Sequence, residues 1–480
     1  MNFENKKLLE FNKLLEGKKV AIIGMGVSNI PLLDYFYKTN TQVTVFDKKP
    51  LSDEIMKKIN NYRYEVEIDE ANLEKLKNYD IIFRSPSCMP NKPEIEKAVE
   101  QGVMLTSEIE KAVEQGVMLT SEIEMVLKLA PCKIVGITGT EGKTTTTSII
   151  YAILKKAGYN CFLGGNIGKP IFTKIAEMKP DDVVILELSS FQLMNMEISP
   201  NIAVVTNVYP DHLNIHKSYE EYQEAKKNIF KYQSEDGIVV LNKDNEITCN
   251  FAKEAKGNVI FFSSRENLNN GYIYDRKGET IKYCKDGVFT EVLKRQDIKL
   301  RGVHNYENIC AALAATSSLT DMETQIEAIK EFNGVEHRLE FVRELAGVKY
   351  YNDSIGTSPA STIAGLNSFE ENIVLLAGGS DKGLDYKEVG EAIAKHVGTL
   401  ILTGPTAPKI EEATMQALKA EDKKIEIVHC ENMEEAVKMA QNKAKSGDVV
   451  LLSPASASFD AFKNFEERGN IFKELVNKLK

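Results

Sequence analysis

The sequence predicts an α/β protein of three domains: a Rossmann-like N-terminal domain, a central domain with a mainly parallel sheet, and a C-terminal Rossmann-like domain. Two observations predict this class. Short runs rich in Val and Ile alternate with amphipathic stretches along most of the 480 residues, which is typical of parallel strands joined by helices. The changes of pattern divide the chain at 1–130, 131–334 and 335–480, in keeping with domains of roughly 100–200 residues.

The first block opens with a buried-strand run, Val20 to Ile23, that leads into a glycine turn at Gly24 and Gly26. A second strand run ends on Asp47 and a third ends at Ser85. Strand, glycine turn, helix and an acidic strand end are the layout of half a Rossmann fold. The third glycine of the dinucleotide fingerprint is missing, which disfavours NAD(P) and leaves an ordinary α/β turn open.

An exact tandem repeat follows. The segment EIEKAVEQGVMLTS occupies residues 94–107 and again 108–121. Its period is too short for a solenoid unit, and two copies do not make an array. One copy is enough to finish the first sheet, so we expect the other to extend a helix or loop.

The remaining strand runs continue the α/β pattern. The central block contains VVILELSS, IAVVTNV and GIVVLNKDN, followed by a hairpin in GYIYDRKGETIKY with Lys-Gly at its turn. The last block contains VKYYNDS, NIVLLAGG, TLILTG, IEIVHC and DVVLLSP, separated by stretches with helical periodicity. We expect a second open parallel sheet there.

Composition excludes several classes of protein. The formal net charge of −10 gives no general attraction to nucleic acid or to anionic membranes. We find no secretory signal and no apolar run long enough to span a bilayer. The seven cysteines are scattered without a C-x-x-C pair, which argues against a disulfide framework or a structural zinc site. We therefore expect a cytoplasmic protein that is not inserted in a membrane.

The strongest chemical signal is a glycine-rich loop between a strand and a helix. It reads Gly139, Thr140, Glu141, Gly142, Lys143, Thr144 and Thr145. Such a loop wraps its amides around phosphate, the lysine contacts the outer phosphates, and the threonine after it binds Mg²⁺. It predicts an ATP–magnesium site, although Ile137 stands where the standard P-loop has its first glycine. The alternative is a glycine turn that merely enters a helix.

Two more strand ends should meet this loop, because ligands of open α/β sheets bind at the carboxyl ends of the strands. Glu187 lies at one such end, and Asp211 and His212 lie just beyond another. These side chains suit magnesium coordination and phosphoryl transfer. Taken alone, Glu187 could be a strand-end carboxylate and His212 a structural histidine. Lys226, on an amphipathic helix, would by itself be read as a solvated surface charge.

Several longer segments carry a family resemblance. They are IVGITGTEGKTTTT, ELSSFQL, TNVYPDHLNIH, GVHNYENICAALAA, NGVEHRLEFV, YYNDSIGTSP and LLSPASASFDAFKNFEERG. Together they resemble the Mur ligase family of peptidoglycan synthesis over nearly the whole chain outside the repeat. The last two segments are most similar to the branch that adds D-glutamate to UDP-N-acetylmuramoyl-L-alanine. The resemblance implies a UDP-sugar domain, a central ATPase domain and a C-terminal amino-acid domain, in that order.

The resemblance also implies roles for individual residues. The first glycine turn becomes a uridine-diphosphate site, with Gly24, Ser28, Asn29, Asp47 and Ser85. Lys226 carries a carbamate made from CO₂, and Lys143, Thr144, Glu187, His212 and this lysine surround two Mg²⁺ ions. Asn166 contacts the muramoyl substrate or its metal. Asn305 and Asn308 lie near the adenine, Arg338 and Asp353 hold the nucleotide, and Thr357, Lys382, Ser458 and Phe465 form the D-glutamate pocket. Ile355 stands where some relatives have lysine.

The implied reaction activates a carboxylate. ATP phosphorylates the carboxylate of the UDP-sugar substrate to an acyl phosphate, and the amine of D-glutamate then displaces phosphate. We expect the enzyme to act as a monomer. Three alternatives remain open: a sister ligase such as a folylpolyglutamate synthase, a nucleotide switch that hydrolyses ATP, and an NAD(P) dehydrogenase built on the Gly24 turn.

Overall fold

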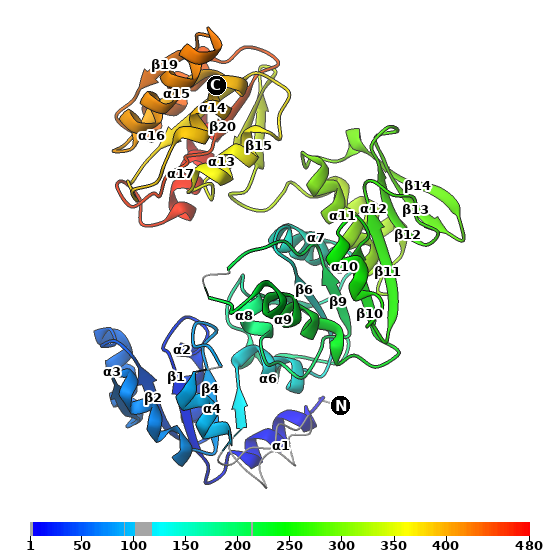
Figure 1. Cartoon of the computed structure of the whole chain (residues 1–480), viewed down its shortest axis with the longest axis vertical. Coiled ribbons are helices and arrows are strands. Elements are labelled where there is room, and N and C mark those ends of the chain that lie inside the picture. The colour runs from blue at the N-terminus through cyan, green and yellow to red at the C-terminus, as the bar shows by residue number, and fades with distance from the viewer. Residues whose placement is uncertain (1–2, 91, 101–117, 213–214) are drawn as a thin grey trace. The chain divides into compact units, whose positions relative to one another are not determined.

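The described residues form three β-sheets with helices around them (Figure 1). The computed structural model describes residues 3–90, 92–100, 118–212 and 215–480. The chain forms two compact units, Met1–Lys294 with Glu307–Ile329, and Arg295–Tyr306 with Lys330–Lys480. The first unit carries two of the sheets and the second unit carries the third. The predicted α/β class with mainly parallel sheets is confirmed, while the predicted boundaries at 130/131 and 334/335 stay predictions.

The N-terminal sheet is parallel, with strand order β3-β2-β1-β4-β5. Its strands are β1 (Lys19–Ile23), β2 (Gln42–Asp47), β3 (Glu65–Ile68), β4 (Ile81–Arg84) and β5 (Met118–Thr120). The helices around it are α1 (Lys6–Leu14), α2 (Ile30–Lys38), α3 (Asp53–Tyr62), η1 (Glu70–Asn78), α4 (Pro93–Glu100) and α6 (Glu122–Leu129). The chain builds the sheet from β1 through β2 to β3 on one side and then returns to add β4 on the other side of β1. The carboxyl ends of β1 and β4 therefore flank a switch point where ligands bind in such sheets.

Both copies of the tandem repeat contribute an element here, the first a helix and the second a strand of the sheet. The helical half of the first copy, from Glu94 to Glu100, belongs to α4. The strand half of the second copy forms β5, the edge strand that pairs with β4. Residues 101–117 lie outside the described residues, so the expected extension of a helix or loop stays a prediction.

The central sheet has nine strands in the order β14-β13-β12-β11-β10-β9-β6-β8-β7. They are β6 (Lys133–Thr138), β7 (Cys161–Gly165), β8 (Val183–Glu187), β9 (Ile202–Val205), β10 (Ile238–Asn242), β11 (Asn258–Ser263), β12 (Gly271–Asp275), β13 (Thr280–Lys285) and β14 (Val288–Lys294). The pairs from β7 to β12 are parallel, and the last two pairs are antiparallel. The predicted hairpin is therefore confirmed as β12 and β13.

Helices of the central block place the residues that matter for the site. They are α7 (Lys143–Lys156), η2 (Phe172–Glu177), α8 (Ser190–Leu193), α9 (Tyr219–Lys231), α10 (Glu246–Phe251), η3 (Arg295–Asp297), α11 (Val303–Thr316) and α12 (Met322–Glu331). One apolar cluster runs through both sheets of the first unit. Phe172 joins them, because its ring packs edge-on against Tyr35 at 4.7 Å and Phe11 at 6.4 Å between ring centroids.

The second unit is a six-stranded sheet of order β15-β16-β20-β17-β18-β19. Its elements are β15 (Glu340–Leu345), β16 (Val348–Asn352), β17 (Ile373–Gly378), β18 (Val397–Thr403), β19 (Glu426–His429), β20 (Val449–Leu452), α13 (Pro359–Leu366), α14 (Lys387–His396), α15 (Ala407–Glu421), α16 (Met433–Lys443) and α17 (Phe465–Lys478). Only the β15–β16 pair is antiparallel. Apolar clusters lie on both faces, which explains the continuous hydrophobic strand runs.

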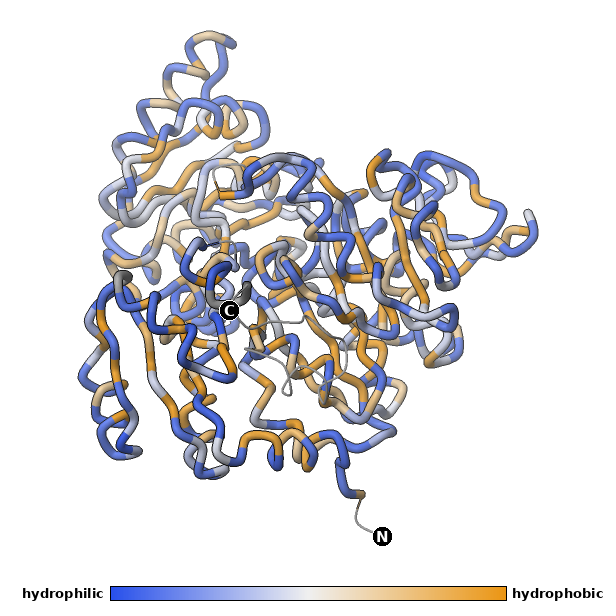
Figure 2. The backbone as a smooth tube through the Cα atoms, turned by 60° about the horizontal axis from the view of Figure 1, so that its bottom comes forward, coloured by the Kyte–Doolittle hydropathy of each residue, from blue (hydrophilic) through white to orange (hydrophobic). Residues whose placement is uncertain are grey.

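Hydropathy follows this layering. Figure 2 shows orange, hydrophobic segments along the strands and mainly blue segments at the outer turns. Among the described residues, no helix has the length and apolar character needed to cross a membrane.

Candidate active site

The phosphate loop lies between the end of β6 and the start of α7. Gly142, the N-cap of α7, has a φ of 79°, and Gly139 has a φ of 150°. A Cβ on Gly142 would lie 2.3 Å from Asn308 Oδ1, and one on Gly139 would lie 1.9 Å from Thr206 Oγ1. Both backbone conformation and space therefore require glycine at these two positions.

Side chains at the end of β9 hold this loop in shape. Asn207 accepts a hydrogen bond from the amide of Glu141 at 2.9 Å through its Oδ1, and its own carbonyl accepts from the amide of Thr140 at 3.0 Å. Thr206 donates to the carbonyl of Glu141. The hydroxyl of Thr140 donates to the carbonyl of Tyr209 at 3.1 Å. Groups of the protein itself thus hold the loop in shape, which lowers the cost of ordering it on binding.

Two lysine side chains converge on one carbonyl of the loop. Lys143 Nζ donates to the carbonyls of Gly139 at 3.1 Å and Thr140 at 2.9 Å. Lys226 Nζ donates to the same Gly139 carbonyl at 2.7 Å and lies 3.4 Å from Thr138 Oγ1. The structure therefore brings Lys226, predicted from the family resemblance alone, to the phosphate loop.

Lys226 is buried rather than solvated, with 2 % of its surface exposed. Its Nζ lies 4.6 Å from the centre of the Tyr222 ring, and no carboxylate among the described residues lies within ion-pairing distance of it. Burial and the nearby charge of Lys143 hold the pKa of Lys226 well below its usual value, while Asp211 raises it weakly. The surface-charge interpretation of this lysine is wrong, because the side chain points into the site.

Thr144, Glu187 and Asn166 form a hydrogen-bonded group beside the loop. Thr144 donates to Glu187 Oε2 and Asn166 Nδ2 donates to Glu187 Oε1, both at 2.8 Å. Glu187 ends β8 and is 1 % exposed. A threonine hydroxyl and a carboxylate within hydrogen-bond distance are hard oxygen donors of the kind that Mg²⁺ prefers. Among the described residues, no three His, Cys, Asp or Glu side chains are grouped to hold a metal, so such a site here depends on Thr144 and other oxygen donors.

His212 lies at the rim of this region. Its side chain is 47 % exposed and its Nε2 lies 3.4 Å from Asp211 Oδ2. Its ring contacts Phe191 at 5.1 Å between centroids. Phe191 belongs to α8, directly after the strand that ends in Glu187, so His212 is near the loop system but does not contact Glu187 or Thr144 in this structure. Its role as a metal ligand stays a prediction.

The glycine turn of the N-terminal sheet is braced by its own side chains. Asp47 Oδ2 accepts from the amide of Met25 at 2.9 Å. Asn29, which is fully buried, donates to the carbonyls of Ile23 at 3.1 Å and Gly24 at 2.9 Å. The side-chain Nδ2 of Asn29 therefore uses its hydrogen bonds to hold the turn. The same turn approaches the predicted Ser85 so closely that a Cβ on Gly24 would lie 2.6 Å from Ser85 Oγ. Ser28, also predicted, is half-buried beside it.

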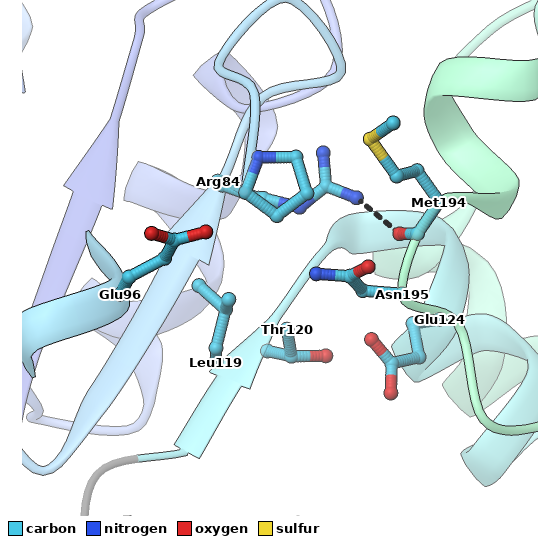
Figure 3. Close-up of a pocket in the computed structure, with 8 residues that line it drawn as sticks. Arg84, Glu96, Leu119, Thr120, Glu124, Met194 and Asn195 are labelled. Atoms are coloured by element: carbon cyan, nitrogen blue, oxygen red, sulfur yellow. Dashed lines mark hydrogen bonds between the residues drawn. The ribbon is translucent and has the colours of Figure 1, made fainter. Parts of the chain in front are cut away.

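Arg84 connects this turn to the central block and was not singled out from the sequence. It is 5 % exposed and precedes Ser85 at the end of β4. Its guanidinium donates to the carbonyls of Met194 at 2.9 Å, Phe191 at 3.3 Å and Cys88 at 3.3 Å. Figure 3 shows it beside a cavity of about 90 Å³ that Glu96 and Glu124 also line. Burial lowers the pKa of Arg84.

Four residues outside the loop are predicted to lie near the adenine or to hold the nucleotide, and one of them, Asn308, lies with the loop in the first unit. Asn308 Oδ1 accepts from Thr146 Oγ1 at 3.2 Å, directly behind Gly142. Asn305, Arg338 and Asp353 belong to the second unit. Asn305 donates to the carbonyl of Arg301 at 2.6 Å.

Asp353 is the most perturbed acid of the second unit. It is 4 % exposed, and its carboxyl group accepts from Ser453 Oγ at 2.7 Å and from the amide of Leu339 at 3.2 Å. Burial raises its pKa to about 7, against the lowering effect of these bonds and of the Arg338 charge. A carboxyl group buried without an ion pair is typical of a functional site.

The four predicted D-glutamate residues lie around the carboxyl ends of the second unit's strands. Lys382 Nζ lies 5.7 Å above the ring of Phe459, next to the buried Ser458. Phe465 begins α17, and its carbonyl accepts from Ser354 Oγ at 2.8 Å. Thr357 follows Ile355 after β16, in the turn just before α13. Their pocket role stays a prediction.

Three residues near the phosphate loop lacked a sequence signal of their own. Asn207 and His216 lie within the quoted segment TNVYPDHLNIH, and Tyr222 lies four residues before Lys226, but their burial and contacts depend on packing between α8, α9 and the loop. Spacing could not have separated them from their neighbours, because no periodic pattern runs through these turns.

Comparison with known proteins decides the family. The Mur ligase MurD-like N-terminal domain matches residues 18–107, the Mur ligase middle domain matches 137–316, and the Mur ligase glutamate ligase domain matches 337–456. The chain belongs to the Mur ligase family. The order of these three domains is the one that the resemblance implied.

Relatives extend over the full chain. A protein of Acetivibrio thermocellus named UDP-N-acetylmuramoylalanine–D-glutamate ligase is 47% identical over 99% of both chains. Among solved structures, the UDP-N-acetylmuramate-alanine ligase MurC of Thermotoga maritima shares the fold with a TM-score of 0.56 at 19% identity, covering 96% of this chain and 100% of that one. The MurF ligase of Thermotoga maritima, solved in complex with ADP, has a TM-score of 0.52 at 19% identity over 96% of this chain and 94% of that one. As a Mur ligase, the chain has the fold in which these enzymes act.

Proposed function

We propose that this Mur ligase joins D-glutamate to UDP-N-acetylmuramoyl-L-alanine at the expense of ATP, in cytoplasmic peptidoglycan precursor synthesis. One observation carries the ATP-driven part. The phosphate loop, the Thr144–Glu187–Asn166 group and the buried Lys226 meet at the carboxyl edge of one sheet. The acceptor is taken from the relative that is 47% identical over the full chain and is named for this reaction.

The proposed chemistry has two steps. The terminal carboxylate of the UDP-sugar substrate attacks the γ-phosphorus of ATP, giving an acyl phosphate and ADP. The amine of D-glutamate then attacks the acyl carbon, and the tetrahedral intermediate expels phosphate to leave the amide. The enzyme forms no covalent bond to substrate, so its contribution is positioning and charge stabilisation.

Residues of the first unit would divide this work. The amides of the loop and the ammonium of Lys143 would bind the phosphates once Lys143 exchanges its two carbonyl acceptors for phosphate oxygens. Thr144 and Glu187 would hold magnesium, which when bound neutralises charge on the transferring phosphoryl group. Asn166 keeps Glu187 oriented. We propose two such ions, with His212 contributing from the rim.

Lys226 fits this arrangement as a carbamate better than as an ammonium. A buried ammonium would repel a cation, and none of the described carboxylates pairs with this lysine. Its neutral amine would attack CO₂ through nitrogen and release one proton, which leaves an anionic carbamate with two oxygen donors. Burial and the charge of Lys143 both lower its pKa and so favour the neutral amine that this step requires.

Phosphate release tests the reaction. The protein would be supplied with UDP-N-acetylmuramoyl-L-alanine, ATP and Mg²⁺, with and without D-glutamate. We expect release to require D-glutamate. Release at the same rate without it would contradict the ligase proposal and favour a nucleotide switch. We propose that the chain acts as a monomer, which light scattering during turnover would check.

The neighbouring lysine on α9 offers a matched control for the carbamate. Lys226→Ala is expected to abolish turnover and to regain part of it in added short-chain carboxylic acid, which supplies the missing oxygen donors. Lys227→Ala removes a lysine that pairs with Glu224 and Glu254 at 2.6 and 2.7 Å, and it should retain activity. Full activity of Lys226→Ala without the acid would rule out the carbamate.

A further inference from the structure

His216 is a buried histidine that the proposed chemistry does not use. It lies in the turn before α9 and is 2 % exposed. Its ring stacks on Phe191, with 5.1 Å between centroids and 9° between planes. It also meets the ring of Tyr222 in an edge-on arrangement, with 5.3 Å between centroids and 77° between planes. The imidazole therefore contacts one aromatic residue of α8 and one of α9.

The polar atoms of His216 argue against a role as core filling. Nε2 lies 3.0 Å from Ser190 Oγ, which is also buried. Nδ1 is buried and has no hydrogen-bond partner, although Glu221 Oε2 lies 3.5 Å away and accepts from the amide of Lys217. A phenyl ring would fill the same space, so core filling alone does not require an imidazole here. What the imidazole adds is the bond to Ser190, which fixes the ring in one orientation.

The neighbours of His216 connect it both to the strand that carries Glu187 and to the helix that carries Lys226. Ser190 and Phe191 follow β8, the strand that ends in Glu187. Tyr222 lies one turn before Lys226 on α9, and its ring faces Lys226 Nζ at 4.6 Å. The hydroxyl of Tyr222 is hydrogen-bonded to Thr140 Oγ1 of the phosphate loop at 3.0 Å. The His216 ring thus links the segment after Glu187 to Tyr222, which in turn contacts Lys226 and Thr140.

We propose that His216 is a positioning residue that seats Tyr222, and through it fixes the phosphate loop and Lys226 relative to the strand end that carries Glu187. The effect on turnover rests on the proposed ligase function, whereas the effect on the loop does not. A displacement of about 1 Å among reacting groups lowers rates by about a hundredfold. A small shift of Tyr222 is therefore enough to matter without unfolding the protein.

Kinetics of His216→Phe test the proposal. This variant keeps a ring and loses the bond to Ser190. We expect kcat to fall about tenfold or more, with the KM for D-glutamate unchanged and the Tm within a few degrees of wild type. His396→Phe is the matched control, because His396 Nε2 is also buried without a partner but lies on α14 of the second unit. Equal kcat for the two variants would overturn the proposal.

A second variant keeps the test usable if the phenyl ring disturbs folding. His216→Gln can still bond to Ser190 but offers no ring to Tyr222. We expect its kcat to fall as well, because the proposal requires a ring that is both present and anchored. Wild-type kcat in His216→Gln would overturn it.

A double-mutant cycle shows whether His216 acts through Tyr222. Tyr222→Phe removes the hydroxyl that meets Thr140 but keeps the ring. If the two residues act in series, the double variant falls about as far as the worse single variant rather than by the product of both losses. Multiplying losses would mean independent effects and would contradict the proposed path.

Binding of Mg·ADP separates this inference from the proposed function. We expect His216→Phe to weaken Mg·ADP binding, measured by calorimetry, by at least about twofold, the low end for coupled neighbours, and His396→Phe to leave it unchanged. If wild-type phosphate release did not require D-glutamate, the ligase proposal would fail while this measurement still decided on His216. Unchanged ADP affinity together with unchanged kcat would reject the positioning role.

Discussion

Asp353 is a carboxyl group whose ionisation the second unit has to accommodate. It follows β16, is 4 % exposed, and has two hydrogen-bond donors, Ser453 and the amide of Leu339, but no ion pair. Burial raises its pKa from 3.8 to about 7. Because a tenfold change in proton affinity is worth about 1.4 kcal/mol, the ionised carboxylate costs the ligand-free fold roughly 4 kcal/mol relative to an exposed one.

Asp353→Asn should remove this cost with little change in geometry. The amide oxygen can accept from Leu339, and the amide nitrogen can donate to Ser453 Oγ, which already lies 2.9 Å from Thr362 Oγ1. Both hydrogen-bonding neighbours of Asp353 therefore keep a partner in the variant. We expect the variant to be more stable than wild type at pH 8.5 and to lose ATP turnover, since we propose that Asp353 holds the nucleotide.

The gain should depend on pH with a definite sign. A carboxyl group whose pKa is raised in the folded state binds more protons folded than unfolded between pH 3.8 and about 7. Wild type therefore loses stability as pH rises through this window, and the asparagine variant does not. The difference in unfolding free energy should be small near pH 4, grow by about 3 kcal/mol between pH 5 and pH 8.5, and level off above pH 8.

Urea unfolding of the second unit, followed at several pH values, measures this difference. Asp385→Asn is a suitable control, because Asp385 is an exposed acid of the same unit whose carboxylate accepts from the amide of Lys387. This control separates the burial of the Asp353 carboxyl group from the general effect of removing one acidic side chain from the unit. If Asp353→Asn gained nothing between pH 5 and pH 8.5, the carboxyl group would not be ionised at a cost in the fold, and the reasoning from burial would be refuted.

Three further predictions follow from particular contacts. Gly142→Ala should weaken Mg·ADP binding by about tenfold or more, measured by calorimetry, because the new Cβ meets Asn308 Oδ1 at 2.3 Å and a φ of 79° costs an L-residue about 1–2 kcal/mol; unchanged affinity would show that the loop tolerates a side chain. Arg84→Met should destabilise the first unit by about 2–4 kcal/mol in urea unfolding, because the buried carbonyls of Met194 and Cys88 lose their donor, and a loss below 1 kcal/mol would mean that water replaces it. Deletion of residues 101–114 leaves one complete copy of the repeat, with the α4 and β5 sequences joined; its Tm and turnover should equal or exceed those of wild type, and loss of folding would show that both copies are needed.

The strands given in the sequence analysis could be predicted because their residues form locally distinct apolar runs. The runs from Val20 to Ile23 and from Val183 to Glu187 are continuous apolar segments, as expected for strands covered on both faces. The repeat shows the limit of such reasoning. Its two copies have identical local preferences, so the sequence cannot say that β5 comes from the second copy while α4 begins in the first. Pairing with β4 decides that, and pairing is not a local property.

Some residues of the candidate site could likewise be predicted from local sequence, whereas others could not. The role of the loop from Gly139 to Thr145 could be predicted because its glycines, lysine and threonine are adjacent in sequence. The burial of Lys226 could not be predicted from its neighbours, because a helix with charged neighbours predicts a solvated side chain. Only the packing of α9 against the loop buries it. His216 and Arg84 were missed for the same reason, as their partners lie on other elements.

In the part of the chain that the structure describes, both units bury an ionisable side chain that has no ion-pairing partner. In the first unit it is Lys226, and in the second it is Asp353. A buried charge without a partner opposes folding, which lowers the pKa of the Lys226 amine and raises the pKa of the Asp353 carboxyl group. The charged forms become favourable only when something of opposite charge or with hydrogen-bond donors arrives. We propose that a metal facing a carbamate does this for Lys226 and that the donors of a nucleotide do it for Asp353. On this proposal, part of the binding energy of each ligand offsets the cost of burying the group that it meets.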